Sequence, residues 1–387
     1  MTKLFEKDIE TDLNMLPGPI SIHPRVQRAI SYSIIGHRTK PFKDFFDKTV
    51  NMFKEYLHTK NDLFILAGSG SAALETGIVN WVNGENPSST KILCFVNGKF
   101  SERNYKIAKK LGASTVLVEI KDGDPVTPEI VENHLKANKD TNLVTICHNE
   151  TSTGVISPIK EIGEVVKKYN ALLMIDGVTS VAGAYVCPEE QNIDILCSGS
   201  QKSWGLPPGL SMVCISPRAW ERIPGKTSSF YFDLRAYKKD PNPYTPAISL
   251  IYGLHESLSM MLEETEEKRT KRHSWNADLV RTGVKALGLK LFAKEGYESP
   301  VVTSLVVPEG ISDEIRKELN NLGVWIAPGQ GEMKGQIFRI ATMNMIREKD
   351  VLTTFALFEI VLHKNGYKFE LGTSVKAIQE KILTKLS

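Results

Sequence analysis

The chain has 387 residues, of which 48 are basic and 45 are acidic, so its formal net charge is +3. Hydrophobic residues make up 41% and charged residues 24%, a balance that is typical of a globular protein and excludes a disordered chain. Because nucleic-acid binders usually carry a strong basic excess, the near-neutral charge disfavours nucleic acid as a partner. No run approaches the roughly 20 apolar residues of a membrane-spanning helix. Small metabolites are the partners that these properties favour.

The cysteines and the N-terminus indicate the compartment. Five cysteines occur without a CxxC pair, and four of them lie within apolar runs. That pattern predicts buried free thiols and argues against a disulfide framework or a zinc site, while Cys187 is expected to be a loop thiol. Residues 1–15 contain acids and lack the apolar core of a secretory signal. We therefore expect a cytoplasmic protein without a metal ion.

In chain order, a turn at Pro17–Pro19 and a helix from about Phe42 to His58 precede a region in which short apolar runs alternate with amphipathic segments. The apolar runs are expected to form strands at Leu63–Ala67, Lys91–Val96, Thr115–Ile120, Leu143–Cys147, Leu172–Asp176, Ile193–Ser198 and Ser211–Ile215. Their nearly continuous apolar character is typical of strands covered on both faces. Helices are expected at Ser71–Val82, Glu102–Leu111 and Pro158–Tyr169, with another beginning at Thr127–Pro128. This alternation predicts an α/β fold with a mostly parallel sheet.

After residue 250 the pattern changes. One long helix is expected over Leu254–Gly283, and its charged run EETEEKRTKRH is interpreted as a solvated face. The elements that follow are a strand (Val301–Val307), a helix (Ser312–Leu322), a strand (Gln336–Ala341) and a closing helix (Lys349–His363). They predict a smaller α+β C-terminal domain. We therefore divide the chain into an N-terminal arm (1–20), a large domain (21–255) and a small domain (256–387).

The segment LFILAGSGSAALE has the pattern of a strand, a Gly/Ser loop and a helix. Backbone N–H groups in such a loop, together with the helix N-terminus, form an anion site. The spacing Gly68-x-Gly70-x-x-Ala73 also fits the dinucleotide fingerprint, which further needs an acid at the end of the next strand. That strand ends in Asn97, which disfavours a nicotinamide-dependent oxidoreductase. A phosphate site and a plain tight turn both stay open here.

Two further segments carry ionisable groups at strand ends. In ALLMIDGVTS, Asp176 ends an apolar strand at the sheet edge where α/β proteins place their ligands. In DILCSGSQKSWGLPPG, Lys202 follows a buried strand, where a desolvated amine has a lowered pKa and can form a Schiff base. Alone, Asp176 is as well explained as a turn cap, and Lys202 as a surface lysine. Together with a phosphate cradle they supply the groups that a pyridoxal phosphate (PLP) site requires.

The whole sequence resembles the class V aminotransferases of PLP-dependent transferase fold type I, and most closely their alanine–glyoxylate / serine–pyruvate group. The supporting motifs, in order, are PGP (Pro17–Pro19), GHRTKPF (Gly36–Phe42), GSGSAALE (Gly68–Glu75), NGKFSER (Asn97–Arg103), HNETSTGVISP (His148–Pro158), DGVTS (Asp176–Ser180), SGSQKSWGLPPG (Ser198–Gly209), YTPAISLIYGL (Tyr244–Leu254) and FRIATMN (Phe338–Asn344). Each motif alone is weak, but so many in the right order are specific. The resemblance implies PLP as cofactor, bound by the large domain.

The resemblance also implies the residues that bind the cofactor. Lys202 would form the Schiff base and later act as general base, and Asp176 would pair with the pyridinium nitrogen. Phe100 would stack on the ring, at a position that is often Trp in the family, and Thr151 would lie near the ring hydroxyl. The phosphate would be held by Ser69, Gly70, Ser71 and Gln201.

Substrate and subunit contacts follow from the same resemblance. Arg339 would bind the substrate carboxylate bidentately. Gly18, in the PGP turn, and His37 are expected at the substrate pocket, although His37 fits helix packing or a dimer interface equally well. Thr245 matches a residue that reaches the phosphate of the neighbouring subunit, which implies a homodimer with shared sites.

Several of these assignments have a plain structural alternative. Phe100 fits a core aromatic, and Arg339 fits an edge residue paired with an acid. His148 and Glu150, beside Thr151, are interpreted as structural.

The activity expected is transfer of an amino group from serine or alanine to glyoxylate or pyruvate through a Lys202 aldimine, with ping-pong kinetics. One alternative is a cysteine desulfurase-like PLP lyase. It needs a mobile nucleophilic cysteine, and such enzymes tend to carry histidine at the positions of Gln201 and Phe100. Another is a 2-aminoethylphosphonate transaminase, which needs extra positive charge of the kind that Arg38 offers. A non-catalytic scaffold is disfavoured by the completeness of the site.

Overall fold

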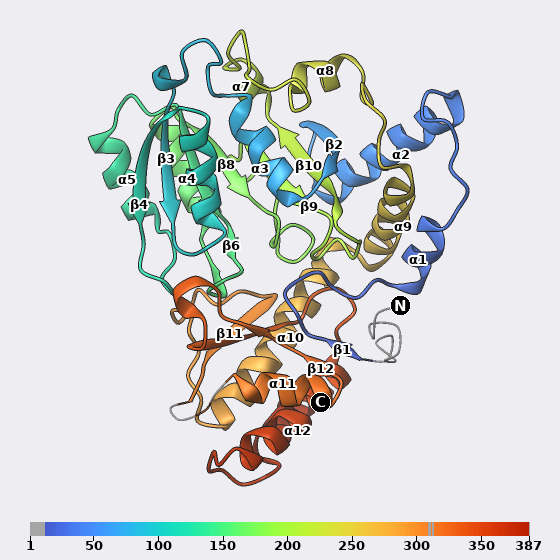
Figure 1. Ribbon diagram of the computed structural model, residues 1–387, viewed down its shortest axis with the longest axis vertical. Helices are drawn as coiled ribbons and strands as arrows, with labels where there is room; N and C mark the ends of the chain where they lie inside the picture. Colours follow the sequence, from blue (N-terminus) through green and yellow to red (C-terminus); the bar gives the residue numbers. More distant parts are fainter. Residues whose placement is uncertain (1–11, 309–310, 312, 387) are drawn as a thin grey trace.

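The computed structural model in Figure 1 describes residues 12–308, 311 and 313–386. A large part built on a central sheet lies above a smaller part in this view, and helix α10 (Glu266–Ala286) runs downward into the smaller part. Strand β1 (Leu13–Asn14) pairs with β12 (Val324–Trp325), so the first described residues lie on the smaller part. Residues 1–11 of the predicted arm lie outside the described residues.

The central sheet has seven strands in the order β2-β10-β9-β8-β5-β3-β4. They are β2 (Asp62–Gly68), β3 (Lys91–Val96), β4 (Ser114–Glu119), β5 (Leu143–Cys147), β8 (Leu172–Asp176), β9 (Ile195–Gly199) and β10 (Gly209–Ile215). Within this sheet β10 runs antiparallel to both neighbours, and the other pairings are parallel. Every predicted strand is present with its ends within two residues of those expected. The α/β fold with a mostly parallel sheet is confirmed.

Helices cover both faces of this sheet because its strands are apolar on both faces. In β2, Leu63 and Ile65 belong to one core and Phe64 and Leu66 to the other, as side-chain alternation requires. The first core is closed by α1 (Pro24–Ile30), α2 (Lys40–Tyr56), α5 (Pro128–Ala137), α6 (Ile159–Lys168) and α9 (Ile248–Glu264). The second is closed by α3 (Gly70–Val79), α4 (Ser101–Lys110), α7 (Pro217–Trp220) and α8 (Leu234–Lys239). A short hairpin, β6 (Asn149–Glu150) and β7 (Val155–Ile156), lies beside the sheet.

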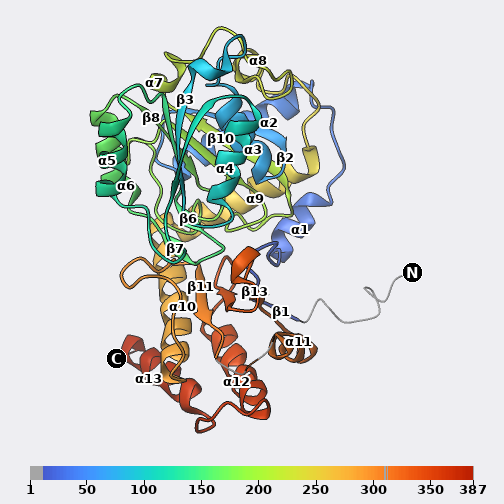
Figure 2. The same ribbon diagram turned by 60° about the vertical axis from the view of Figure 1, so that its left-hand side comes forward.

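The smaller part packs helices against a sheet of three short strands in the order β11-β14-β13. The strands are β11 (Val302–Val306), β13 (Ala327–Pro328) and β14 (Ile337–Ala341), and the helices beside α10 are α11 (Glu314–Asn321), α12 (Glu348–Lys364) and α13 (Thr373–Leu386). Figure 2 shows α10, α12 and α13 side by side, and their apolar residues share one core. The predicted α+β pattern is present, although α13 was not predicted. The boundaries at residues 20 and 255 stay a prediction, and residue 255 lies within α9.

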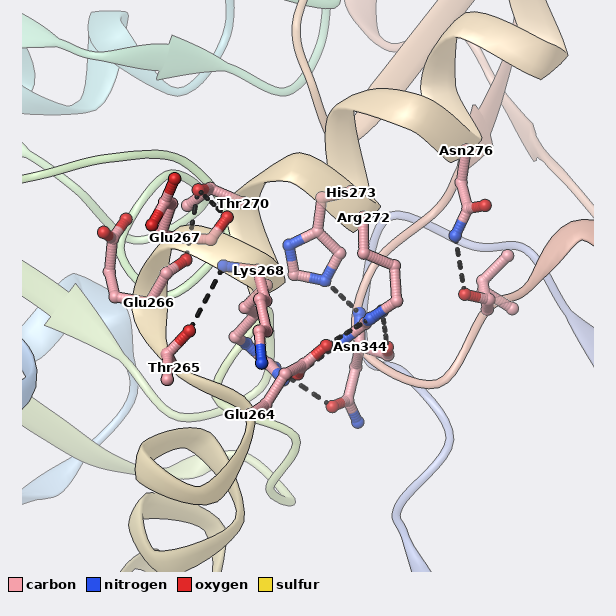
Figure 3. Close-up of polar contacts among 12 residues, drawn as sticks. Glu264, Thr265, Glu266, Glu267, Lys268, Thr270, Arg272, His273, Asn276 and Asn344 are labelled. Atoms are coloured by element: carbon pink, nitrogen blue, oxygen red, sulfur yellow. Dashed lines mark hydrogen bonds and ion pairs between the residues drawn. The ribbon is translucent and has the colours of Figure 1, made fainter. Parts of the chain in front are cut away.

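The single long helix expected over Leu254–Gly283 is wrong. Two helices, α9 and α10, meet at Thr265, whose φ of 70° interrupts the helical backbone. The Thr265 hydroxyl accepts a hydrogen bond from the Lys268 N–H and so caps α10 (Figure 3). The sequence showed no break because no glycine or proline marks it.

The charged run across this break is not a solvated face throughout. Lys271 and Glu267 do form an exposed pair one turn apart, as expected. Arg269 and His273, in contrast, are 4% and 0% exposed. Charge patterns in a sequence do not distinguish solvated ion pairs from charges that are buried with partners, which explains the error. No helix in the described part of the chain is long and apolar enough to cross a membrane.

Candidate active site

A cavity opens at the carboxyl ends of β5 and β8, next to the loops that follow β2 and β9, and its empty space of about 420 Å³ includes the solvent at its mouth. This is the edge at which parallel sheets present polar groups to ligands. The cavity is lined by Ser69, Gly70, Ser71, Leu74, Phe100, Arg103, Cys147, Thr151, Asp176, Val178, Thr179, Gln201 and Lys202. Eight of the residues predicted to bind a cofactor are therefore brought together here from segments distant in the sequence.

Asp176 ends β8 and points a buried carboxyl group at the cavity. Burial raises the pKa of Asp176 to about 6, and the Val178 N–H, which donates to its Oδ1 at 3.0 Å, acts against this rise. A positively charged group bound next to this carboxyl would stabilise its ionised form, since an opposite charge lowers the pKa of a buried acid.

Lys202 lies in the loop after β9 and is only 7% exposed. The pKa of Lys202 is lowered to about 8, mainly by burial and in addition by the positive charge of Arg339. The Lys202 Nζ donates a hydrogen bond to the Pro17 carbonyl of the N-terminal segment. Gly18 lies against the lysine, because a Cβ at this position would come within 2.8 Å of Lys202 Cδ. Its φ of 119° also favours glycine, so a residue with a side chain at position 18 would prevent this close approach of the PGP turn to the amine.

An anion cradle forms where β2 turns into α3. Ser69 is the N-cap of α3, and its hydroxyl makes no capping hydrogen bond, so it is free to face a ligand. The next residue must be small, because a Cβ on Gly70 would lie 2.8 Å from Val178 Cγ2. The Arg103 guanidinium donates to Ser71 Oγ at 2.8 Å and adds positive charge to the cradle. Free N–H groups at a helix N-terminus, hydroxyls and a nearby cation together suit a phosphate.

Arg339 extends from the centre of β14 toward this site. Its Nη1 donates to the Thr151 carbonyl at 3.1 Å and its Nε to the Pro328 carbonyl at 2.9 Å. Burial lowers the pKa of Arg339 to about 10. No acid among the described residues lies within ion-pair distance of it, so the alternative of an arginine paired with an acid does not hold in this part of the chain. A guanidinium oriented by carbonyls and lacking a carboxylate partner suits an external carboxylate.

Residues 27–347 match the family model described as Aminotransferase class-V. The chain belongs to the class-V aminotransferases. It is 40% identical over 98% of its length to an uncharacterized aminotransferase of Methanocaldococcus jannaschii, covering 99% of that protein. It is 32% identical to a serine–glyoxylate aminotransferase of Methylorubrum extorquens, with 94% of each chain covered. The crystal structure of a ureidoglycine–glyoxylate aminotransferase from Bacillus subtilis superposes with a TM-score of 0.91 at 31% identity, covering 96% of this chain and 98% of that one.

Class-V aminotransferases depend on PLP, and the cavity of this aminotransferase fits that cofactor. The buried Asp176 carboxyl suits the pyridine nitrogen, and the cradle at the start of α3 suits the phosphate. The side-chain amide of Gln201 has a buried oxygen without a hydrogen-bond partner at the same cavity. Lys202 supplies a partly deprotonated amine for the aldehyde. The Phe100 ring offers an apolar face, with Lys202 Nζ 5.7 Å from its centroid.

Glu150 holds the loop that presents Phe100. Its buried carboxylate accepts hydrogen bonds from the backbone N–H groups of Phe100 at 3.2 Å and Ser101 at 2.8 Å. It also accepts from the N–H of Ser152 at 3.0 Å. A Cβ on Gly98 would lie 2.5 Å from Glu150 Cγ, so the loop packs tightly on this carboxylate. These contacts agree with the structural role expected for Glu150.

Four predicted site residues are not among the residues that line the cavity within one chain. Two of them adjoin it, because Gly18 contacts Lys202 and Arg339 donates to the Thr151 carbonyl. His37 is partly buried with its Nε2 unpaired, and Thr245 is exposed; neither lines the cavity. The expectation for Thr245 concerns a neighbouring subunit and stays a prediction. Cys187 lies in a loop, as expected, and its thiol is buried, with 2% exposure and its Sγ near the His58 carbonyl.

Sequence reasoning missed Arg103 as a site residue. It lies one helical turn after Phe100 on α4, which places both side chains on one face of that helix. The guanidinium carbon is 5.4 Å from the centroid of the Phe100 ring. The spacing could have identified it, but the NGKFSER motif was used only for its aromatic residue.

The lowered pKa of Lys202 makes a direct prediction for the cofactor-free protein. Since its pKa is about 8, the amine loses its proton, and becomes nucleophilic, about two pH units below an ordinary lysine. Acetylation with a small anhydride, followed peptide by peptide by mass spectrometry, should show Lys202 labelling half-maximal near pH 8. The exposed Lys160 is followed in the same samples as the comparison site. Half-maximal labelling of Lys202 near pH 10 would contradict its desolvation.

Proposed function

We propose that this aminotransferase moves the amino group of a small neutral amino acid, serine or alanine, to a small keto acid, glyoxylate or pyruvate. The observation that carries the proposal is Arg339, an arginine without an acid partner that reaches the Thr151 carbonyl at the cavity wall. Arg339 is available for one carboxylate, whereas Arg103 lies at the phosphate cradle, where it donates to Ser71. With Arg103 assigned to the phosphate, the described lining residues offer a dicarboxylic substrate no further arginine. The names of the serine–glyoxylate and ureidoglycine–glyoxylate relatives support glyoxylate as acceptor.

In this proposal Lys202 and Asp176 are the catalytic residues. PLP, when bound, supplies an electron sink that acidifies the substrate Cα–H. Lys202 would hold the cofactor through its amine and, once released from it, would accept the proton of the substrate Cα on Nζ and later give it up again. A pKa of about 8 suits an amine that must both accept and release a proton near neutral pH. Asp176 would hold the ring nitrogen of the cofactor and favour its protonated form through the negative charge of the carboxylate. The two half-reactions use one site in turn, which predicts ping-pong kinetics.

The remaining site residues would hold and orient the cofactor and the substrate. Ser69, Gly70, Ser71 and Gln201 would bind the phosphate, Phe100 would cover one ring face, and Thr151 would lie at the ring hydroxyl. The Thr151 hydroxyl is 2.5 Å from that of Thr179, which fixes its direction. Arg339 would bind the α-carboxylate that every substrate shares, so it cannot select among donors. Selection is assigned to the PGP turn with Gly18 and to the segment containing His37 and Arg38.

The alternatives gain no support from the site. A cysteine desulfurase-like reaction needs an accessible nucleophilic thiol, whereas all five cysteines are buried. Cys147, which lines the cavity, donates to the Asn149 carbonyl, and burial holds its pKa well above the usual value. For 2-aminoethylphosphonate, the extra cation considered was Arg38, which is exposed and does not line the cavity.

We also propose a homodimer with shared active sites. Large apolar side chains are exposed in the segment before His37, with Tyr32 at 68% and Ile34 at 66% exposure. Phe230 is 83% exposed, and its ring centroid lies 5.5 Å from that of Tyr244, next to Thr245. Apolar surface of this kind usually lies at protein interfaces. A second copy covering both segments would bring Thr245 toward the partner's phosphate cradle.

A panel of substrates tests the proposed function. Serine, alanine and aspartate are each offered with glyoxylate, pyruvate and 2-oxoglutarate, and kcat/KM is measured for every pair. We expect serine or alanine with glyoxylate or pyruvate to rank first, and aspartate and 2-oxoglutarate to rank last. Lys202→Ala should abolish all activity and the yellow colour of the protein, while Lys160→Ala, at an exposed position, should change neither. A preference for the dicarboxylic pair would overturn the proposed substrate class.

Arg339→Lys tests the carboxylate clamp. Lysine keeps a positive charge but loses the two-pronged geometry that matches a carboxylate. Because a charged hydrogen bond contributes about 1.5–3 kcal/mol, we expect KM to rise about tenfold to a hundredfold for amino acid and keto acid alike. The cofactor absorbance should be retained. An unchanged KM would place the clamp on another residue.

Sedimentation equilibrium tests the dimer. The wild-type protein should have twice the mass of one chain, and Ile34→Asp combined with Phe230→Asp should shift it toward the monomer with loss of activity. A fully active wild-type monomer would exclude shared sites.

A further inference from the structure

A cluster of buried charged and polar side chains lies outside the cavity, where α9 ends and α10 begins. Arg269 and His273 are one turn apart on α10 and therefore project from the same face of the helix. Both are buried, and neither lines the cavity. Figure 3 shows His273 directed toward Asn344, with Arg272 and Glu264 beside it.

Arg269 donates hydrogen bonds to three separate segments of the chain. Its Nε donates to the Ala182 carbonyl at 3.0 Å, and its Nη2 donates to the Ser203 carbonyl at 2.7 Å. The same Nη2 donates to Asn344 Oδ1 at 3.1 Å. Its remaining arm, Nη1, pairs with Glu264 Oε2 at 3.1 Å. The guanidinium is thus occupied on every side.

These three segments follow the three strands that matter most for the site. Ala182 lies in the stretch after β8, which ends in Asp176. Ser203 comes directly after Lys202 in the loop that follows β9. Asn344 comes shortly after β14, which carries Arg339. The Arg269 side chain therefore links the segments that follow β8, β9 and β14. These three strands position Asp176, Lys202 and Arg339.

His273 makes a second link between two of the same segments. Its Nδ1 lies 3.1 Å from the Gly183 carbonyl, and its Nε2 lies 3.0 Å from the Asn344 N–H. Because a carbonyl only accepts and an N–H only donates, Nδ1 carries the proton and the ring is neutral. Arg272 Nη1 donates to the Asn344 carbonyl at 2.6 Å and its guanidinium pairs with Glu264 at 2.5 Å.

The lysine loop and the Asn344 segment also touch each other directly. A Cβ on Gly205 would lie 2.8 Å from Asn344 Nδ2, so the Asn344 side chain packs against the Gly205 backbone as closely as glycine permits. The Gly205 N–H in turn donates to the Lys202 carbonyl at 2.9 Å. A shift of Asn344 is therefore transmitted to the lysine over a short path.

The chemistry of this cluster argues for a positioning role. A buried guanidinium carries a large desolvation cost, and apolar residues of similar volume usually stabilise a fold at least as well. What an apolar residue cannot do is fix several backbone carbonyls at set directions and distances. The break at Thr265 also supports this positioning role. It allows Glu264, the last residue of α9, to pair with both Arg269 and Arg272.

We propose that Arg269, assisted by His273, is a positioning residue for transamination. It fixes the lysine loop relative to the strand of Arg339, so that a substrate held by its carboxylate presents its Cα to Lys202. The inference rests on the proposed roles of Lys202, Asp176 and Arg339. Neither Arg269 nor His273 lines the cavity, so their role would be indirect.

The first test compares Arg269→Lys with Arg281→Lys in the full-length holoenzyme. Arg281 is the matched control, since it is a mostly buried arginine on the same helix that donates to the Ser299 carbonyl and to none of the three segments. Lysine keeps the charge at Arg269 but cannot bridge three carbonyl acceptors. We expect amide hydrogen exchange to speed up in the segments around Ala182, Ser203 and Asn344 together. In the control, exchange in these three segments should be unchanged.

Kinetics supply a second readout for Arg269→Lys. We expect kcat/KM to fall about tenfold to a hundredfold for donor and acceptor, since misplacing reacting groups by about 1 Å costs about that much. Arg281→Lys should stay near wild type. Faster exchange in only one segment, or equally across the whole chain, would overturn the proposal.

Asn344→Gly keeps the proposal testable if Arg269→Lys does not fold. Glycine tolerates the φ of 55° at this position and removes only the side chain that Arg269 holds. We expect faster exchange around Asn344 and a KM about tenfold higher for both substrates, with the cofactor dissociation constant unchanged. A KM equal to wild type would show that the Asn344 link does not position Arg339.

The hydrogen-exchange readout separates this proposal from the proposed function. If the wild-type protein is inactive with every substrate pair, the proposed function fails. The exchange pattern of Arg269→Lys still decides whether the three segments are held together.

Discussion

Desolvation of two ionisable groups at one edge of the sheet is the constraint on which the site depends. Burial raises the pKa of Asp176 to about 6 and lowers the pKa of Lys202 to about 8, because in each case it disfavours the charged form. Desolvation thus gives Lys202 an amine that can lose its proton near neutral pH, and it gives Asp176 a carboxyl group whose ionised form is stabilised by a bound cation. Both properties are those that a PLP enzyme uses, and neither exists for these residues in water.

The sheet produces this desolvation through its topology. β8 and β9 are neighbouring parallel strands, and Asp176 pairs in register with Cys197. Helices on both faces bury the strands fully, so a polar residue at a strand end emerges from an apolar interior. The antiparallel strand β10 lies on the other side of β9 and turns the lysine loop back toward the sheet. The loop is anchored there by Ser200 Oγ, which donates to the Pro207 carbonyl at 2.7 Å.

The sequence allowed the central sheet and most of the cavity to be predicted, because both depend on local patterns. Continuous apolar runs marked every strand, and residues such as Ser69, Asp176 and Lys202 stand at strand ends that the pattern locates. The break at Thr265 was missed because a β-branched residue at positive φ is held there by tertiary contacts and has no sequence signal. The burial of Arg269 and His273 was missed for a related reason: their partners lie on segments far away in the chain.

Besides the hydrogen bond from Arg339 to the Thr151 carbonyl, two connections join the strand of Arg339 to Lys202. One is the network of Arg269, which reaches Asn344 beyond the end of β14. The other is the N-terminal segment, where the Ala341 N–H of β14 donates to the Met15 carbonyl at 2.8 Å and the Lys202 Nζ donates to the Pro17 carbonyl. Since the clamp and the lysine belong to different parts of the molecule, each connection restricts rotation of one part against the other. This accounts for the presence of both a buried arginine and a closely packed glycine turn around one amine.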